Sequence, residues 1–133
     1  MIVVFDTNVL IAAIITEGIC SKLLHRAAAG EFSLISCPFI MKELRRTLSK
    51  KFRLSHEETV SAIEPIKEAI ERCIEHDFKI TDIYRDADDD NIIACAVAAK
   101  ADYLVTGDSD LLEIKSYKDI KIITPRDFEA LFR

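Results

Sequence analysis

Two short apolar runs of this chain each lead into an aspartate. Asp6 directly follows Ile2–Phe5, and Asp108 lies two residues beyond the run Tyr103–Thr106. Short apolar runs that alternate with helical patterns predict buried strands joined by right-handed crossovers, and therefore a parallel sheet covered by helices on both faces. The carboxyl ends of such strands border the crevice where open α/β sheets bind ligands. We therefore expect a three-layer α/β domain with acidic side chains at that edge.

The expected elements fill the chain, so we predict a single domain over residues 1–133. Strands are expected at Ile2–Phe5, Phe32–Ser36, His76–Ile80, Tyr103–Thr106 and Lys121–Ile123, and helices at Val9–Ile15, Ile19–Ala29, Pro38–Lys50, Asp88–Lys100 and Thr124–Phe132. Ser55-His56-Glu57-Glu58 is a capping-box signature. The apolar stripe behind it predicts one more helix, which runs as far as Ile74 with a kink near Pro65.

The composition favours a soluble, cytoplasmic protein. No uninterrupted apolar stretch reaches the ~18 residues that a membrane span needs, and no basic region with a cleavage site precedes the first strand. The net charge of -5 argues against a general nucleic-acid coat but not against a nuclease, because acids gathered at a metal site bias the count. The four cysteines form no C-x-x-C pair, which argues against a zinc ribbon or a redox dithiol.

Five carboxylates are candidate ligands of one metal ion: Asp6, Glu43, Asp90, Asp108 and Asp110. Clustered carboxylates repel one another unless a cation lies between them, and hard divalent ions such as Mg²⁺ prefer oxygen ligands. Each acid also has an ordinary explanation. Asp6 would cap the helix that follows it, Glu43 would be a surface helix residue, and the acids near residue 108 would belong to a polar turn. The set as a whole favours a metal site.

The acidic run Asp86–Asp90 has an ordinary explanation too, because acids at the start of a helix oppose its dipole. The run resembles the start of an EF-hand loop, but the sixth and twelfth positions lack the required Gly and Glu. We expect Asp88 to cap the helix and Asp90, which lies closest to the apolar helix body, to bind the metal. A shift of the motif by one residue would give that role to Asp89.

Four motifs, in this order, resemble those of PIN domains, and more narrowly those of stand-alone prokaryotic PIN proteins of the VapC type, the toxins of toxin–antitoxin pairs. They are Asp6-Thr7-Asn8-Val9-Leu10, Glu43, Asp90-Asn91-Ile92-Ile93-Ala94 and Thr106-Gly107-Asp108-Ser109-Asp110-Leu111. The resemblance covers essentially the whole chain. It implies a Mg²⁺- or Mn²⁺-dependent ribonuclease whose acids lie at the carboxyl edge of a five-stranded parallel sheet.

The resemblance also assigns a role to each residue that matches a functional position of the family. It places Asp6, Glu43, Asp90 and Asp108 at the family's four acidic positions and Asp110 at a further acid. Asn8 and Thr106 match polar positions that orient the site. The acids would hold one or two cations, which activate water and stabilise charge on the scissile phosphate.

The implied partners are an RNA substrate, a small antitoxin protein and a second copy of the chain in a homodimer. Basic residues are grouped from Lys42 to Arg53. A solvated helix face and phosphate contact explain this group equally well. If it contacts phosphate, Arg45, Arg46 and Lys50 are the expected RNA-binding residues.

Two other α/β families fit less well. A haloacid-dehalogenase-like phosphatase needs a second Asp two residues after the first, where this chain has Asn8. A phosphoacceptor receiver domain needs a pair of acids near its first strand and a Lys after its last, and the chain has neither. The alternatives that remain are a non-catalytic PIN-fold module that binds protein or RNA, and another metal-dependent phosphoesterase.

Overall fold

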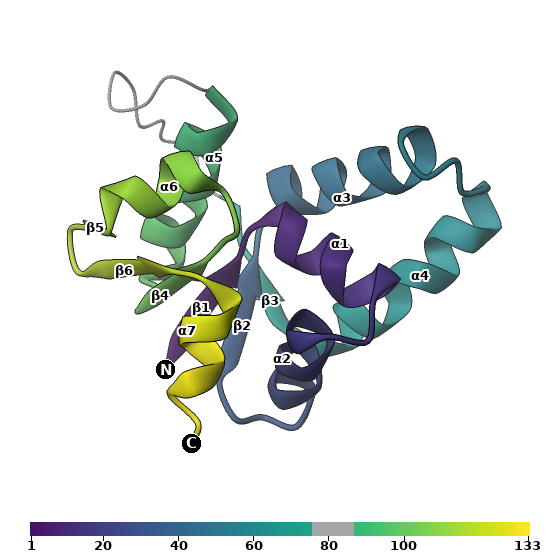
Figure 1. Ribbon diagram of the computed structural model, residues 1–133. Coiled ribbons are helices and arrows are strands. Elements are labelled where there is room, and N and C mark those ends of the chain that lie inside the picture. The colour runs from purple at the N-terminus through teal and green to yellow at the C-terminus, as the bar shows by residue number, and fades with distance from the viewer. Residues whose placement is uncertain (76–86) are drawn as a thin grey trace.

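The computed structural model describes residues 1–75 and 87–133, with the side chains of 1–75 and 89–133. In chain order, its elements are β1 (Ile2–Phe5), α1 (Thr7–Ile15), α2 (Ile19–Ala28), β2 (Ser33–Ser36), α3 (Pro38–Lys50), α4 (His56–Ala69), β3 (Ile70–Cys73), α5 (Ala87–Ala99), β4 (Tyr103–Val105), α6 (Ser109–Ile114), β5 (Ser116–Tyr117), β6 (Ile120–Ile123) and α7 (Pro125–Ala130). Figure 1 shows them along the chain.

The strands of the described part of the chain form one sheet in the order β3-β2-β1-β4-β6-β5. The first five are parallel, and β5 pairs antiparallel with β6. The predicted three-layer α/β fold with a parallel sheet is confirmed, but the sheet has six strands instead of five. Of the strands that the sequence did not predict, β5 is two residues long and joins β6 through a tight turn in which Lys118 has a φ of 54°. A strand this short leaves no periodic pattern in the sequence.

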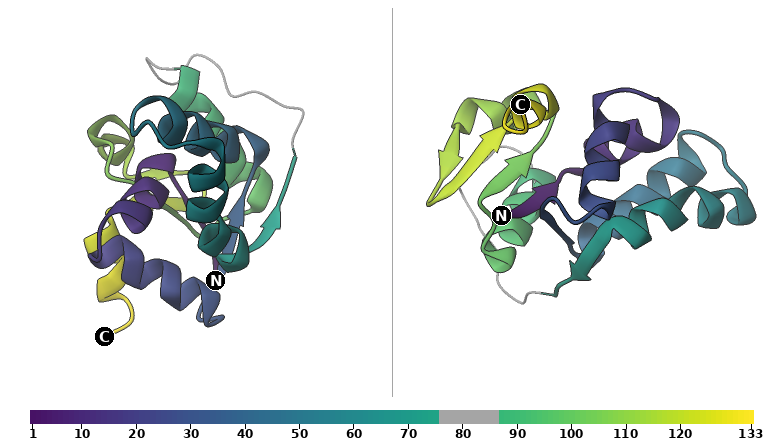
Figure 2. Two further views of the ribbon diagram at one scale, coloured as in Figure 1. Left: turned by 90° about the vertical axis from the view of Figure 1, so that its right-hand side faces the viewer. Right: turned by 90° about the horizontal axis from the view of Figure 1, so that it is seen from below.

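The order of the strands explains where the helices lie. The chain moves outward from β1 to β2 and β3, then returns past β1 to β4. Right-handed crossovers in opposite directions put their helices on opposite faces of the sheet. Accordingly, α5 packs on β1, β2 and β4, whereas α1, α2 and α4 contact one another on the other face (Figure 2). The reversal creates a switch point between β1 and β4, the place where open α/β sheets bind ligands.

Several helices begin where the sequence predicts, because a local side chain satisfies free backbone N–H groups. The predicted capping box at the start of α4 is confirmed: the Ser55 hydroxyl accepts from the Glu58 N–H, and the Ser55 N–H donates to the Glu58 carboxylate. Pro38 and Pro125 occupy the first turns of α3 and α7, where a missing N–H costs nothing.

The predicted helix after Ser55 is too long. It ends at Ala69, and Ile70–Cys73 forms the edge strand β3, with Ile70 already extended at a ψ of 122°. Ile70 pairs with Leu34 of β2, and the Ile74 N–H donates to the Ser36 carbonyl at 2.8 Å. Without β3, the outer edge of β2 would expose a row of unpaired backbone groups, and their pairing outweighs the helical pattern. The strand expected at His76–Ile80 lies outside the described residues.

The central strand is buried on both faces. Val3, Val4 and Phe5 are all 1% exposed or less. The Phe5 ring lies 5.8 Å from that of Phe32 and 6.3 Å from that of Phe128, measured between ring centroids, so β1, the start of β2 and α7 share one aromatic cluster. This packing fixes β1 as the rigid support for the residue that follows it.

No single helix in the described ranges is long and apolar enough to cross a bilayer. Helices α1 and α2 reach the necessary length and composition only when they are taken together, and the chain bends by 100° between them.

Candidate active site at the carboxyl edge of the sheet

Asp6 is fixed by the end of β1 and the start of α1. Its N–H donates to the Val105 carbonyl at 2.9 Å, so the sheet hydrogen bonds extend to this residue. Its carboxylate caps α1, because Oδ1 accepts from the Thr7 N–H at 2.7 Å. Oδ2 accepts from the Thr106 hydroxyl, also at 2.7 Å. Asp6 is 7% exposed, so both oxygens of a nearly buried carboxylate have defined orientations.

Thr106 and Asn8 connect the ends of β1 and β4. Thr106 is fully buried, and its hydroxyl accepts from the Asp108 N–H at 3.0 Å while it donates to Asp6. One hydroxyl therefore holds the first aspartate and the backbone of the second. The Asn8 side-chain oxygen accepts from the Gly107 N–H at 3.4 Å, which is a long and weak hydrogen bond.

Asp108 lies at the carboxyl end of β4 and caps the short helix α6, where its Oδ1 accepts from the Asp110 N–H at 2.9 Å. Carboxylate oxygens of Asp89, Asp108 and Asp110 lie within 4.8 Å of one another. Oxygens that bind one Mg²⁺ at its usual bond length lie roughly 3–4 Å apart. The spacing of this cluster therefore suits a hard divalent cation.

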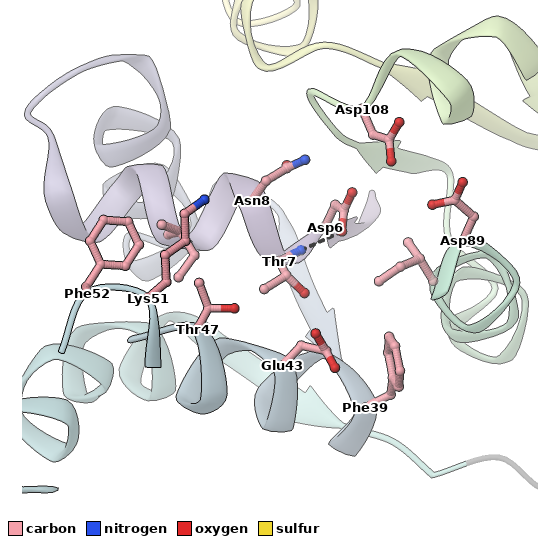
Figure 3. A pocket seen from close by; sticks show the side chains of 12 residues that line it. Asp6, Thr7, Asn8, Phe39, Glu43, Thr47, Lys51, Phe52, Asp89 and Asp108 are labelled. Carbon is pink, nitrogen blue, oxygen red and sulfur yellow. Dashed lines mark hydrogen bonds between the residues drawn. The ribbon is translucent and has the colours of Figure 1, made fainter. Parts of the chain in front are cut away.

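A cavity of about 330 Å³ opens at this edge of the sheet. Four carboxylates from four different elements or their ends line it: Asp6, Glu43, Asp89 and Asp108. Figure 3 shows Asp6 between Glu43 on α3 and the pair formed by Asp89 and Asp108. The fold therefore brings residues that are far apart in the sequence to one side of one cavity, as expected for acids at a switch point.

The acid that α5 contributes to the cavity is Asp89. Asp90 does not line the cavity, and its Oδ1 is buried without a hydrogen-bond partner. Successive residues of an α-helix point about 100° apart, so two neighbours cannot face the same side. Asp110 belongs to the cluster with Asp89 and Asp108 but is not among the residues that line the cavity. The side chain of Asp88, the predicted cap, lies outside the described residues.

The surroundings of Asp6 disfavour its negative charge. Burial raises the pKa of Asp6, and the negative charge of Asp108 raises it further, whereas the hydrogen bonds from Thr106 and Thr7 lower it. No basic side chain in the described ranges lies within ion-pair distance of Asp6 or Asp108. A donor set of carboxylate oxygens with this mutual repulsion fits Mg²⁺ or Mn²⁺ and fits no soft metal.

The basic residues predicted to contact RNA lie elsewhere. Arg46 lies 3.6 Å from Glu43 as an exposed i,i+3 pair, an arrangement that contributes little to stability. Arg45 lines a separate hollow beside β3, and Lys50 is exposed outside the cavity. In place of these basic residues, Lys51 is the basic residue from this region that lines the cavity, together with Phe52 beside it.

A signal for these residues was present in the sequence. Phe39, Glu43, Thr47 and Lys51 follow one another at intervals of four, and residues at this interval share one face of a helix. All four line the cavity. The position of Glu43 therefore predicts the others, once the face that it occupies is known to border the site.

Comparisons with known proteins agree on the fold. The family model described as PIN domain matches residues 2–110. A comparison with curated proteins finds no significant match. Among solved structures, the chain is similar to one in the crystal structure of VapBC2 from Rickettsia felis bound to a DNA fragment from their promoter. The TM-score is 0.67 and the sequence identity 19%, and the match covers 93% of this chain and 98% of that one. The residues that the family model matches include the four acids that line the cavity. The chain belongs to the PIN domain family.

Proposed function

We propose that this protein is a divalent-metal-dependent endoribonuclease, which cleaves RNA phosphodiester bonds and acts as the toxin of a toxin–antitoxin pair. The observation that carries the proposal is the convergence of Asp6, Glu43, Asp89 and Asp108 on one cavity at the switch point of the sheet. Membership in the PIN domain family supports it. The net charge of -5 is compatible with an RNA substrate, because cations held by these acids would offset the repulsion between the cavity and a phosphate backbone.

The residues that would hold Mg²⁺ or Mn²⁺ are Asp89, Asp108 and Asp110, with Asp6 and Glu43 at the same end of the cavity. When bound, the cation supplies Lewis-acid stabilisation of charge on the scissile phosphate and lowers the pKa of a water molecule. We assign Asp89 the role that the sequence motif gave to Asp90, because Asp89 lines the cavity.

The other site residues orient these acids. Thr106 holds the Asp6 carboxylate and the Asp108 backbone through one hydroxyl, and Asn8 holds the loop at Gly107. Glu43 lines the cavity and pairs only with the exposed Arg46, at 3.6 Å, so we assign its carboxylate the orientation of an attacking water molecule. Such outer partners fix ligand geometry and are often as important as the ligands themselves.

Cleavage of single-stranded RNA by the Asp6→Asn and Asp89→Asn variants tests the proposal. Both variants keep the size of the side chain and remove its charge, so we expect folded proteins whose Mg²⁺-dependent cleavage falls by orders of magnitude. Glu113→Gln, which removes one exposed acid outside the cavity, is the control. A chelator should abolish cleavage by the native protein, and added Mn²⁺ should restore it.

Other results would select an alternative. RNA binding by the native protein without metal-dependent cleavage would indicate a non-catalytic module. Cleavage of small phosphodiesters in the absence of RNA cleavage would indicate another metal-dependent phosphoesterase. Undiminished RNA cleavage by both variants would point to a different site.

The proposed partners are a small antitoxin, a second copy of this chain and RNA, and the proposed compartment is the cytoplasm. The fold likeness to VapBC2 motivates the antitoxin. Ile15 at the end of α1 and Val60 on α4 are 51% and 50% exposed, so each leaves an apolar side chain that a second copy could cover. Growth arrest on expression, relieved by the product of a neighbouring reading frame, tests the antitoxin. Sedimentation over a range of concentrations tests the homodimer.

A further inference from the structure

One face of α3 continues the cavity away from the acids. Phe39, Glu43, Thr47 and Lys51 line it at intervals of four residues, followed by Phe52. Figure 3 shows Glu43 near the acids, and Lys51 and Phe52 at the opposite end of the cavity from Asp89. With a rise of 1.5 Å per residue, Lys51 lies about 12 Å farther along the helix axis than Glu43. The cavity is therefore acidic at one end and ends in a cation and an aromatic ring at the other.

The end of α3 holds Phe52 in this place. The N–H groups of Lys51 and Phe52 both donate to the Thr47 carbonyl, at 2.9 and 3.2 Å. Arg53 then adopts a φ of 55°, and the Leu54 N–H donates back to the Leu48 carbonyl at 3.0 Å. This reversal keeps Phe52 against the end of its own helix. Phe52 is half-buried and packs on the hydrophobic core, so its ring is a fixed wall of the cavity.

Lys51 is the one cation among the described residues that line the cavity. It is exposed and forms no ion pair within the described ranges. Phosphates of a stacked nucleic-acid strand follow one another at about 3.4 Å along the axis, and they lie farther apart where a base leaves the stack. A strand with one phosphate at the acids would therefore bring a phosphate a few nucleotides away to Lys51. Aromatic rings beside such a cation are the usual platform for unpaired bases.

We propose that Thr47, Lys51 and Phe52 form a nucleotide subsite, separate from the acids, in which Lys51 contacts a backbone phosphate and Phe52 stacks on an unpaired base. The inference rests on the proposed function, because a strand that reaches this subsite passes the acids. The subsite requires a single strand, since the bases of a duplex are paired and stacked on one another. It recognises the backbone charge and the face of a base, so it selects no sequence by itself.

Lys51 and Phe52 also have structural roles, and the experiment has to separate these from binding. A cation in the last turn of a helix interacts favourably with the helix dipole, and Phe52 packs on the core. Lys67 is the matched control for charge, because it is an exposed lysine in the last turn of another helix, α4, and does not line the cavity. Phe52→Tyr is the matched control for packing, because it keeps the aromatic ring that Phe52→Leu removes.

The experiment measures binding of a short fluorescent single-stranded RNA by anisotropy, with Asp6→Asn present throughout to prevent cleavage. We expect Lys51→Ala to weaken binding roughly tenfold and to lower the slope of log Kd against log salt by about one. Lys67→Ala should change Kd less than about twofold. Phe52→Leu should weaken binding by roughly ten- to hundredfold, as expected for the loss of one stacked base, and Phe52→Tyr should not. Thermal denaturation of each variant establishes that it is folded.

Modified RNAs locate the contacts. Replacing one phosphate at a time by an uncharged methylphosphonate should reveal a position at which Lys51→Ala causes no further loss. Removing one base at a time should reveal a position at which Phe52→Leu causes none. Equal effects of Lys51→Ala and Lys67→Ala, or equal affinity for a duplex, would overturn the subsite.

The subsite and the nuclease can fail independently. If the native protein cleaves RNA but binding is insensitive to Lys51 and Phe52, the subsite is wrong and the nuclease stands. If both side chains matter for binding but the native protein cleaves nothing, the subsite stands and the nuclease is wrong.

Discussion

Thr106 shows how much one buried hydroxyl can decide. It donates to Asp6 and accepts from the Asp108 N–H, and it has no access to water. No other described side chain joins both strand ends at the cavity through such short hydrogen bonds. Its effect on function would be indirect, because it orients two of the proposed ligands.

Thr106→Val keeps the shape of the side chain and removes the hydroxyl. Two buried polar groups then lose their partner, so we expect the free energy of unfolding to fall by about 1–3 kcal/mol. Mn²⁺ affinity should fall by roughly ten- to hundredfold, as for other residues that orient metal ligands. Urea denaturation and calorimetric titration measure the two effects. Thr106→Ser should restore metal affinity, and a Ser variant as impaired as Val would contradict the role of the hydroxyl.

Asp89 and Asp90 provide a second test at the level of single residues. Asp89→Asn removes a carboxylate from the cavity, so Mn²⁺ affinity should fall by more than about tenfold. Asp90→Asn changes a side chain outside the cavity, so metal affinity and cleavage should stay within roughly threefold, because a helix turns about 100° per residue. Calorimetric titration of both variants is the measurement. Equal losses would show that both side chains reach the metal.

Among the elements, α2 and α7 are joined by a buried charge pair. Arg26 donates from Nε and Nη2 to both oxygens of Glu129, at 2.9 and 2.7 Å, and Glu129 is 2% exposed. The guanidinium also lies 4.7 Å from the centroid of the Phe132 ring and donates to Glu31 at 2.8 Å. Helix α7 in turn places Phe128 in the aromatic cluster with Phe5. The Arg26–Glu129 pair therefore helps to hold α7, and with it Phe128, against β1.

Arg26→Ala should destabilise the fold more than an ordinary surface substitution. It leaves the carboxylate of Glu129 with only Lys22, at 3.7 Å, so we expect a clear fall in the urea midpoint of unfolding. Arg26→Lys should recover only part of the loss, because an ammonium group cannot form the bidentate pair. Cleavage per folded molecule should not change, since neither residue lines the cavity. A urea midpoint unchanged from that of the native protein would contradict a structural role for the pair.

The same pair predicts a pH dependence of stability. Hydrogen bonds from Arg26 lower the pKa of Glu129 below its ordinary value, with the positive charges of Arg26, Lys22 and Arg133 acting in the same direction. A carboxylate whose pKa is lower in the folded state contributes stability that is full above its unfolded pKa of about 4.3 and is lost as pH falls through its folded pKa. Unfolding free energies of native protein and Glu129→Gln, measured from about pH 6 downward, should therefore differ most at the higher pH and converge in acid. A constant difference would exclude this linkage.

At the scale of the whole molecule, the topology places every proposed metal ligand at one edge of the sheet, on elements that belong to both halves of the chain. Asp6 follows β1, Asp108 follows β4, and Asp89 is on α5. A cation held between these elements would bind the folded state only, because the unfolded chain separates the ligands.

Mn²⁺ should therefore stabilise the whole domain against unfolding. At a concentration about 100 times its Kd, the expected gain is about 2.7 kcal/mol. Differential scanning calorimetry of the native protein should show a melting temperature that rises with Mn²⁺ concentration. Glu113→Gln should behave like the native protein, and Asp89→Asn should show a much smaller rise. An identical rise in Asp89→Asn would place the ion elsewhere.

The sequence by itself determined the features that depend on near neighbours. The apolar run Ile2–Phe5 is a buried strand, Asp6 caps the next helix, and the Ser55–Glu58 capping box starts α4. Each of these depends on residues within one or two turns of the chain, so the pattern alone is sufficient. The acids Asp6 and Asp108 could be proposed as site residues for a related reason, whereas Glu43, on a helix, depended mainly on the family resemblance. A strand ends where its apolar run ends, and parallel strands end at the same edge of a sheet.

The tertiary structure alone decided three other features. Ile70–Cys73 has the apolar pattern of a helix, but the unpaired edge of β2, some 35 residues away in sequence, makes it a strand. The rotation of α5 on the sheet brings Asp89 to the cavity, and the residues within the acidic run cannot reveal that rotation. Lys51 lines the cavity and Lys50 does not, and this difference likewise depends on which face of α3 borders the site. In each case the deciding partner lies far away in the sequence, and only the folded chain brings it into contact.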